Sequence, residues 1–244
     1  MRPCGFPSPA TGGGLTIIRN LPHNVTLTNG NALTAAIVCR NVGDAARSLL
    51  GSGFRQAIVA VVGCTGSVGG AATRLFADAG YRLVLIGRNR QRVERDFADL
   101  PAAMCSEHLG DIARADVVVL LTSDASARVT ADLPREGSVV IDCAQPVNIV
   151  RTSYDEFVKR AIVVVEGGIV RIPGYSSTDD FGFSDRAETF ACLAETYVFA
   201  RCGIREHSVG RRTAEDARRI ERLAAQFGVE ARPLDCSYRP VELG

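Results

Sequence analysis

The chain has 244 residues, of which 46% are hydrophobic and 23% are charged, and its formal net charge at pH 7 is +1. This composition excludes disordered and fibrous chains, which lack so large an apolar fraction or repeat a short sequence. It also lacks the strong basic excess of a dedicated nucleic-acid-binding protein, so we expect no nucleic-acid partner. The length suits one large domain or one domain with a small appendage.

The sequence predicts neither a membrane span nor a secretory signal. The longest uncharged stretch, residues 56–73, is interrupted by glycine, serine and threonine, and its irregular backbone would leave polar groups unsatisfied in a bilayer. The first 14 residues, MRPCGFPSPATGGG, lack the apolar core of a signal peptide. We therefore expect a cytoplasmic protein.

The eight cysteines are scattered, and no two have the CxxC spacing of a metal or redox site. Most are expected to be reduced and to behave as small buried hydrophobic residues. We therefore predict no bound metal. The cysteines are Cys4, Cys39, Cys64, Cys105, Cys143, Cys192, Cys202 and Cys236.

A long helix is expected after the first 14 residues, which are rich in Pro and Gly and are typical of a loose tail or a broken edge. Thr28 or Asn29 can cap this helix, and apolar residues then recur at helical spacing until Gly51 and Gly53 end it. The long helix therefore precedes the first clear strand.

Short β-rich runs then alternate with helical stretches. Runs such as IVAVV and VVVLL are apolar without alternation, which is typical of strands that helices cover on both faces. This order predicts an α/β fold with a Rossmann-type, doubly wound parallel sheet, preceded by a long linker helix and followed by C-terminal helices. The expected strands are residues 57–62, 82–86, 103–105, 116–121, 138–142 and 162–165, and the expected helical stretches are 68–79, 91–100, 109–113, 154–160, 185–202 and 213–227.

The first strand ends in GCTGSVGG, a glycine pattern that opens a helix. Glycine at such a turn lets the chain bend sharply and lets a pyrophosphate approach the backbone, while the helix N-terminus supplies N–H donors. The strand before it and the helix after it favour a dinucleotide site over a turn without a ligand. The expected cofactor-binding residues of this turn are Gly63, Thr65, Gly66, Ser67, Val68 and Gly69.

The second strand ends with Gly87, Arg88, Asn89 and Arg90, where an NAD-binding protein would carry an acidic residue for the ribose. Cationic groups at this position favour the 2′-phosphate of NADP(H), with Arg88 and Asn89 as the expected contacts. Alternatively, Arg88 and Arg90 merely begin a solvated helix. Thr122 and Ser123, which end the fourth strand, are expected near the middle of the cofactor.

A cysteine is the strongest candidate for a catalytic residue. No YxxxK pair and no GxSxG turn are present, and the three histidines are isolated in the sequence. Cys192 lies in the expected helix 185–202, on a polar side that it shares with Glu188, Glu195 and Thr196. Because it would lie two turns inside that helix, the helix dipole is expected to lower its pKa only slightly.

Several strings, taken together, resemble the long-chain fatty acyl-(acyl carrier protein) reductases and their broader bacterial relatives. They are TNGNALTAAIVCR, VAVVGCTGSVGGA, LVLIGRN, ADVVVLLTS, VIDCAQPVN, VVEGGIV, FACLAET and SVGR, in collinear order over residues 13–234. The resemblance implies NADPH-dependent reduction of an acyl thioester to a fatty aldehyde, with the acyl-accepting cysteine falling on Cys192. It also implies acyl carrier protein or acyl-CoA as the substrate donor and an aldehyde-consuming enzyme as a further partner.

The same resemblance places the TxGNxxT segment near the catalytic cleft, with Thr28, Gly30 and Asn31 as substrate-binding candidates; a helix cap explains Thr28 equally well. Asp142, Gly167 and Gly168 are also candidates, because they follow the fifth and sixth strands, where open α/β sheets bind ligands. Turn formation explains the glycines about as well.

The sequence departs from the family in two ways, which leave the substrate open. Only a short tail stands where the family usually carries a further N-terminal region, and DCAQPVN and GGIVRIPG replace DGGxPKN and GGIVEHS. We expect residues 1–28 to be a tail or a remnant of the substrate region, 29–53 a linker helix, 54–184 an NADP-binding domain and 185–244 a helical segment carrying the nucleophile.

Two other functions stay open. One is a dehydrogenase of the shikimate or quinate type, which needs no cysteine nucleophile, and the other is a non-catalytic NADP-binding scaffold. An arginine-rich C-terminal run would dock an acidic carrier protein or form a solvated helix face. It comprises Arg201, Arg205, Arg211, Arg212, Arg218, Arg219 and Arg222.

Overall fold

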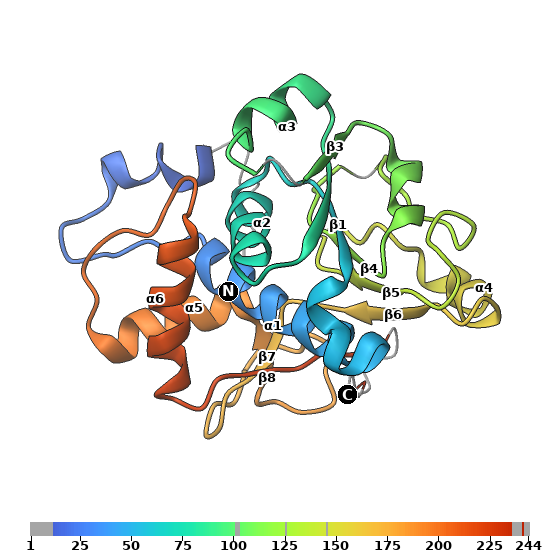
Figure 1. Ribbon diagram of the computed structural model, residues 1–244. Helices are drawn as coiled ribbons and strands as arrows, with labels where there is room; N and C mark the ends of the chain where they lie inside the picture. The colour runs from blue at the N-terminus through green and yellow to red at the C-terminus, as the bar shows by residue number, and fades with distance from the viewer. Residues whose placement is uncertain (1–11, 101–102, 125, 145, 236–240, 242–244) are drawn as a thin grey trace.

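A six-stranded, fully parallel sheet forms the centre of the computed structural model, which describes residues 12–100, 103–124, 126–144, 146–235 and 241 (Figure 1). Its spatial order is β3-β2-β1-β4-β5-β6. This order is that of a doubly wound Rossmann-type sheet and confirms the predicted fold class. The strands are β1 (Ile58–Val62), β2 (Arg82–Ile86), β3 (Met104–Ser106), β4 (Val117–Leu120), β5 (Val139–Asp142) and β6 (Val163–Glu166).

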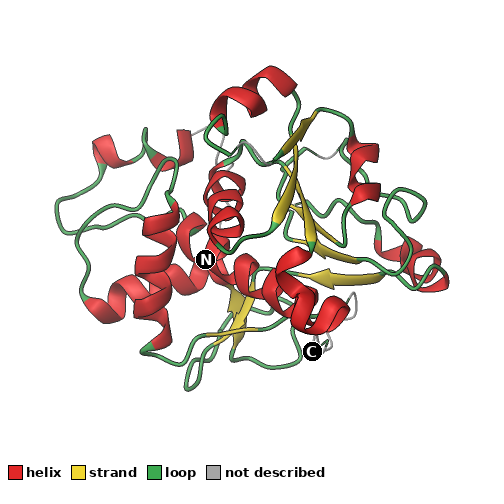
Figure 2. Cartoon of the chain, viewed as in Figure 1, coloured by secondary structure: helices red, strands yellow, loops and turns green. Residues whose placement is uncertain are grey.

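Both faces of the sheet are buried, which explains why its strands are apolar without alternation. In β1, Val59 and Val61 face one hydrophobic cluster while Ala60 and Val62 face another. The helices α1 (Asn31–Leu50), α2 (Ser67–Asp78) and α3 (Arg90–Asp96) contribute to the first cluster. The 3-10 helix Leu109–Arg114 and α4 (Tyr154–Lys159) contribute to the second, and Figure 2 shows helices on both sides of the strands.

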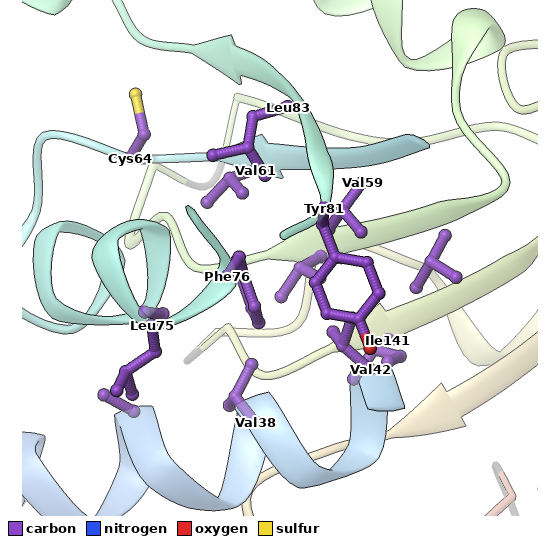
Figure 3. Close-up of a cluster of buried hydrophobic side chains, with 14 of the residues drawn as sticks. Val38, Val42, Val59, Val61, Cys64, Leu75, Phe76, Tyr81, Leu83 and Ile141 are labelled. Atoms are coloured by element: carbon purple, nitrogen blue, oxygen red, sulfur yellow. The ribbon is translucent and has the colours of Figure 1, made fainter. Parts of the chain in front are cut away.

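The long helix α1 lies across the sheet and packs against α2. Figure 3 shows Val38 and Val42 of α1 facing Phe76 and Tyr81. The rings of Phe76 and Tyr81 pack edge to face, with their centroids 6.4 Å apart. The helix ends at Gly51 as predicted, with φ at +53°. The expected cap is wrong, because the N-cap is Gly30 with φ at +71° and no capping side chain of its own. Asn29 instead accepts a hydrogen bond from the backbone N–H of Asn31 (3.1 Å).

The C-terminal part contains a second, antiparallel sheet that the sequence did not predict. Its strands β7 (Ile169–Arg171), β8 (Glu188–Phe190) and β9 (Glu230–Ala231) lie beside α5 (Ala191–Cys202) and α6 (Ala214–Ala225), away from α4 (Figure 1). The predicted helix 185–202 is therefore wrong before Ala191, because pairing with β7 holds residues 188–190 extended. The start of α6 agrees with its prediction, and Thr213 and Asp216 form a capping box there.

Only part of the expected N-terminal tail can be compared, since residues 1–11 lie outside the described residues. Gly13 and Gly14 are buried, and the N–H of Gly210 donates to the carbonyl of Gly13 (2.8 Å), so the tail is not loose there. The short 3-10 helices Gly12–Gly14, Ile18–Asn20, Gly51–Gln56 and Arg151–Ser153 complete the elements. No helix in the described ranges combines the length and the apolar character needed to cross a bilayer.

Candidate active site

Cys192 lies at the start of α5, not two turns inside a helix. Because β8 occupies residues 188–190, α5 begins at Ala191 and Cys192 is its second residue. It is the exposed one among the six described free cysteines, yet protein atoms crowd its thiol. This desolvation raises the pKa of the Cys192 thiol, while the backbone N–H groups of Leu193 and Cys192 lower it and Glu195 raises it. The helix terminus thus opposes part of the cost of forming a thiolate.

The segment TxGN contacts the backbone of Cys192 directly. A Cβ atom at Gly30 would overlap the Cα and Cβ atoms of Cys192, so this approach requires glycine. The positive φ of Gly30 is a second reason for the same residue. The two segments that carry the resemblance most specifically, TxGN and FACLAE, are therefore neighbours in space.

Glu195, in the FACLAE segment, forms hydrogen bonds that connect this segment to the start of α1. Its fully buried carboxylate accepts hydrogen bonds from the backbone N–H of Leu33 (2.7 Å), from the hydroxyl of Ser208 (3.0 Å) and from the hydroxyl of Thr28. Leu33 belongs to the first turn of α1, so Glu195 supplies the cap that Gly30 lacks. Burial raises the pKa of Glu195, while the hydrogen bonds from Thr28, Leu33 and Ser208 lower it.

Glu188 does not share a helix face with Cys192. It lies in β8, is buried, and pairs with Arg232 at 3.0 Å. Glu195 and Thr196 both lie on α5, three and four residues after Cys192, as the helical spacing predicted; Thr196 is exposed, whereas Glu195 is buried.

Asn31 connects this region to the glycine turn. Its Nδ2 donates to Oγ of Ser67 (2.9 Å), the first residue of α2, and Ser67 in turn donates to the carbonyl of Gly210 (3.0 Å). One residue of α1 thus joins the N-terminus of α2 to a segment that contacts Cys192.

The glycine turn bends sharply, as the sequence predicted, and its glycines lie in close contact with neighbouring backbone. Gly63 has φ at +87°, and a Cβ atom there would lie 2.9 Å from the backbone N of Thr122. A Cβ atom at Gly69 would overlap the carbonyl oxygen of Gly63, and one at Gly66 would lie 3.1 Å from it. The turn follows β1 in the sequence and lies beside the end of β4, the neighbouring strand in space. The strand order reverses between β1 and β4, and this is the usual ligand position in this class of sheet.

Arg211 adds a cation at this turn that the sequence analysis did not assign to it. Its Nη2 donates to the carbonyl of Thr65 (2.8 Å) and lies 3.5 Å from Asp96. The SVGR string, which ends in Arg211, was the one sequence signal for this residue. Its contact with Thr65, which is 146 residues away, could not be predicted from the sequence.

A pocket beside Cys192 gathers several of the other predicted residues. Asp142, Gly167 and Gly168 line it, together with Phe190 at the end of β8 and Cys192 on α5. No residue of the glycine turn lines this pocket. The other lining residues are Thr34, Cys143, Val147, Glu166 and Ile169.

Asp142 holds the loop after β5 in place. Its carboxylate accepts from the backbone N–H groups of Ala144 (3.0 Å), Asn148 (2.9 Å) and Ile149 (3.0 Å). Burial raises its pKa, and these three bonds lower it. Glu166, its partner in register on β6, was not predicted; burial raises its pKa and Arg151, at 3.1 Å, lowers it. The pocket therefore has two acidic groups in its lining.

Three predicted cofactor contacts do not line the pocket beside Cys192. Arg88 and Ser123 are exposed, and Asn89 caps α3 by accepting from the N–H of Arg92 (2.8 Å). Arg90 pairs with Glu94 at 2.8 Å, whereas Arg88 has no hydrogen bond or ion pair with the described residues. Val68 packs against the main hydrophobic cluster, so its backbone is the part that faces the turn.

Most of the arginine-rich run is paired within the chain. Arg211, Arg212, Arg218, Arg219 and Arg222 each lie within 4 Å of an acidic side chain, and Arg201 lies over the rings of Tyr197 and Phe227. Their acidic partners offset the positive charge of this face.

Comparison with known proteins gives one informative sequence match. A long-chain acyl-[acyl-carrier-protein] reductase of Synechococcus elongatus is 32% identical over 181 residues, which are 70% of this chain and 51% of that protein. The chain is a distant relative of that reductase. It spans about half of the relative's length. No family model matches the chain.

Solved structures overlap with the chain only partly. A glyoxylate reductase from Paecilomyes thermophila is 15% identical, with a TM-score of 0.40, over 55% of this chain and 48% of that one. A glycerate dehydrogenase related protein from Thermoplasma acidophilum is 16% identical, with a TM-score of 0.44, over 60% and 59%. Such low scores do not bear on function.

Proposed function

We propose that the chain is an NADPH-dependent oxidoreductase that reduces an acyl thioester to an aldehyde through an acyl group held on Cys192. One observation carries this proposal: Cys192 lies against Gly30, while the adjacent Asn31 binds Ser67 at the start of the glycine-turn helix. The match to the acyl-[acyl-carrier-protein] reductase supports the same reaction.

The glycine turn fits a dinucleotide. Gly63, Gly66 and Gly69 let the turn pack tightly on itself and on the end of β4, and the N-terminus of α2, where a diphosphate would approach, follows directly. Arg211 and Thr122 would complete the phosphate end of the site, and exposed Arg88 would take the 2′-phosphate. Residues 54–184 would form this NADP-binding domain, and residues 185–244 would bring the nucleophile.

Cys192 would form the covalent bond to the acyl group. Its Sγ would bond to the carbonyl carbon of the thioester, the bond from that carbon to the donor sulfur would break, and the donor thiol would leave with the proton. Reduced nicotinamide, when bound, supplies the hydride to the acyl carbon. The bond between that carbon and Sγ would then break, which releases the aldehyde and leaves a Cys192 thiolate that takes up a proton. Tethering the acyl group on α5 would turn a bimolecular encounter into an intramolecular one.

The donor would be acyl carrier protein or acyl-CoA, and the aldehyde would pass to an aldehyde-consuming enzyme. Because the arginines of the C-terminal run are largely paired, we do not assign carrier docking to them. The cytoplasmic location stays a prediction.

The test is to incubate the protein with a long-chain acyl-CoA in the absence of NADPH and to search for an acyl adduct on Cys192 by mass spectrometry. We expect an adduct on wild type and none on Cys192→Ala. An unmodified protein that nevertheless oxidises NADPH with a substrate would contradict the covalent route. Turnover by Cys192→Ala would favour the dehydrogenase of the shikimate or quinate type, and NADPH binding without acyl transfer would favour the scaffold.

A further inference from the structure

Acyl transfer to a cysteine needs a group that moves a proton. The thiolate is the nucleophile, so the Cys192 thiol has to lose its proton before or while it attacks. Burial raises the pKa of this thiol, which makes unaided ionisation unfavourable near neutral pH. A general base has to lie within hydrogen-bond reach of the thiol, directly or through one water. The candidates are therefore the titratable side chains of the pocket beside Cys192.

The pocket offers few groups that could take this proton. Besides Cys192, its titratable lining residues are Asp142, Cys143 and Glu166, and the lining within the described part of the chain includes no histidine, lysine or arginine. Burial raises the pKa of the Cys143 thiol far above neutral pH, so this group stays protonated and cannot act as a base. Two carboxylates are left.

The carboxylate of Asp142 is already engaged by the backbone. Its Oδ1 accepts from the N–H of Ala144 (3.0 Å), and its Oδ2 accepts from the N–H groups of Asn148 (2.9 Å) and Ile149 (3.0 Å). Three such donors favour the ionised form, and a proton on this carboxylate would compete with the bonds that hold the loop after β5. Asp142 therefore maintains this loop.

The carboxylate of Glu166 keeps one oxygen available. Its Oε1 accepts from Nη2 of Arg151 (3.1 Å), whereas Oε2 has no hydrogen-bond partner among the residues that the structure describes. The side chain of Glu166 is only 8% exposed, and the residue lines the same pocket as Cys192. Glu166 is thus the pocket carboxylate with an unengaged oxygen.

Backbone pairing brings the end of β6 to the start of α5. The N–H of Ala191 donates to the carbonyl of Gly168 (2.8 Å), so the residue before Cys192 is bonded to the residue two places after Glu166. The chain then continues as β7, which pairs with β8 just before Cys192. These contacts fix Glu166 and Cys192 on two sides of one pocket.

The charges around Glu166 suit a group that exchanges protons. Burial is the largest influence and raises its pKa, and the carboxylates of Asp142 on β5 and of Asp235 near the C-terminus raise it further. Arg151, which precedes α4, lowers it. The net effect is a raised pKa, and a carboxylate whose pKa is closer to neutral is a stronger base for a thiol.

We propose that Glu166 carries the proton during acyl transfer to Cys192. The proposal rests on the function proposed above and adds a residue to that reaction. Oε2 of Glu166 takes the proton from Sγ, directly or through one water, as the bond between Sγ and the carbonyl carbon forms. It gives the proton to the donor sulfur as the bond from that sulfur to the carbonyl carbon breaks. The donor leaves as a free thiol and Glu166 is ionised again, so the step consumes no further reactant.

The experiment measures the rate at which decanoyl-CoA acylates Cys192 without NADPH, by mass spectrometry, from about pH 5 to pH 9. We expect Glu166→Gln to lower this rate about 100-fold at neutral pH. The deficit should narrow towards the alkaline end, because hydroxide then removes the thiol proton without help. Glu166→Asp, which keeps a carboxylate, should recover part of the rate. Glu156→Gln, which changes an exposed carboxylate of α4, is the matched control and keeps the wild-type profile.

Arg151→Met gives a second test that leaves Glu166 in place and serves if Glu166→Gln does not fold. Because Arg151 lowers the pKa of Glu166, its loss raises that pKa. The acylation rate rises with pH as Glu166 ionises, so this rise should move about one pH unit towards the alkaline side. A profile that does not move contradicts the assignment of the proton carrier.

The outcomes separate the two proposals. Wild type that no thioester acylates overturns the covalent function and the role of Glu166 with it. Wild type that is acylated, with Glu166→Gln reacting at the same rate, overturns the role of Glu166 and leaves the covalent function intact. A loss in Glu166→Gln that is equal at every pH does the same, since it shows that Glu166 only shapes the pocket.

Discussion

Gly30 and Cys192 lie so close together that position 30 has no room for a side chain. The contact joins the start of α1 to the start of α5, two helices that are far apart in the sequence. The position of the thiol therefore depends on a residue that is distant along the chain.

Gly30→Ala should displace α5 or prevent folding. The added Cβ overlaps Cys192 and also strains a backbone with φ at +71°, so we expect a loss of about 3 kcal/mol or more in the free energy of unfolding. Urea unfolding and the rate of Cys192 alkylation measure the change. Gly51→Ala is the matched control, because Gly51 has φ at +53° but no atom within 4 Å of an added Cβ. Equal losses of unfolding free energy in the two variants would mean that backbone strain alone, and not the contact with Cys192, destabilises Gly30→Ala.

Glu195→Ala should destabilise the protein more than Glu195→Gln. Alanine leaves the donors of Leu33, Thr28 and Ser208 without their acceptor, at a cost of about 3 kcal/mol, whereas glutamine keeps one acceptor oxygen. Thermal and urea unfolding give the comparison. Indistinguishable variants would show that the carboxylate does not hold these segments.

Glu195→Gln should also flatten the pH dependence of stability. Burial raises the folded-state pKa of Glu195 above its unfolded value. The stabilising contribution is therefore complete below the unfolded pKa and is lost as the pH rises through the folded one. Wild type should lose more of its free energy of unfolding than Glu195→Gln between about pH 4 and pH 8. Glu156→Gln, which changes an exposed carboxylate, controls for the loss of one charge; parallel curves for wild type and Glu195→Gln would contradict the prediction.

Gly69→Ala should abolish NADPH binding, while Gly70→Ala should not. An added Cβ at Gly69 overlaps the carbonyl of Gly63 and opens the turn, but one at Gly70 meets its nearest neighbour at 3.7 Å. Alanine at position 70 lies inside α2 and should stabilise the helix by up to about 1 kcal/mol. Titration followed by NADPH fluorescence and thermal unfolding test both variants. Tight binding by Gly69→Ala would place the cofactor elsewhere.

Arg88→Ala should weaken NADPH binding relative to NADH. The exposed guanidinium of Arg88, whose charge acts on the carboxylate of Asp124 but which makes no ion pair within 4 Å among the described residues, can pair with a 2′-phosphate. Its loss should raise the Kd for NADPH about tenfold. Arg90→Ala removes an arginine that already pairs with Glu94 and serves as the control. If the substitution weakens the binding of NADH and of NADPH equally, Arg88 does not bind the 2′-phosphate.

The predicted strands agree closely with the structure, because continuous apolar runs between turns are a local signal. The helix boundary at Ala191 could not be predicted in this way. Residues 188–190 are extended only because they pair with β7, and that pairing is long-range. The error mattered for function, since it placed Cys192 deep inside a helix instead of at its N-terminus.

The candidate site shows the same division between local and long-range information. Cys192 and the glycine turn were identified from residue types, spacing and a family resemblance. Glu195 was noted only as a polar neighbour, because nothing in its own segment indicates that it caps α1. Arg211 reaches the glycine turn through a contact that only the folded chain makes.

The parallel sheet, the glycine turn and the reactive type of residue could all be inferred from the sequence, since each depends on side chains that are near one another along the chain. Only the folded arrangement established that Cys192 lies in the first turn of α5, that the Glu195 carboxylate connects α5 to α1, and that Glu166 joins Asp142 in the lining of the pocket. These depend on close packing between distant segments, and local patterns of hydrophobicity do not encode which distant surfaces will meet.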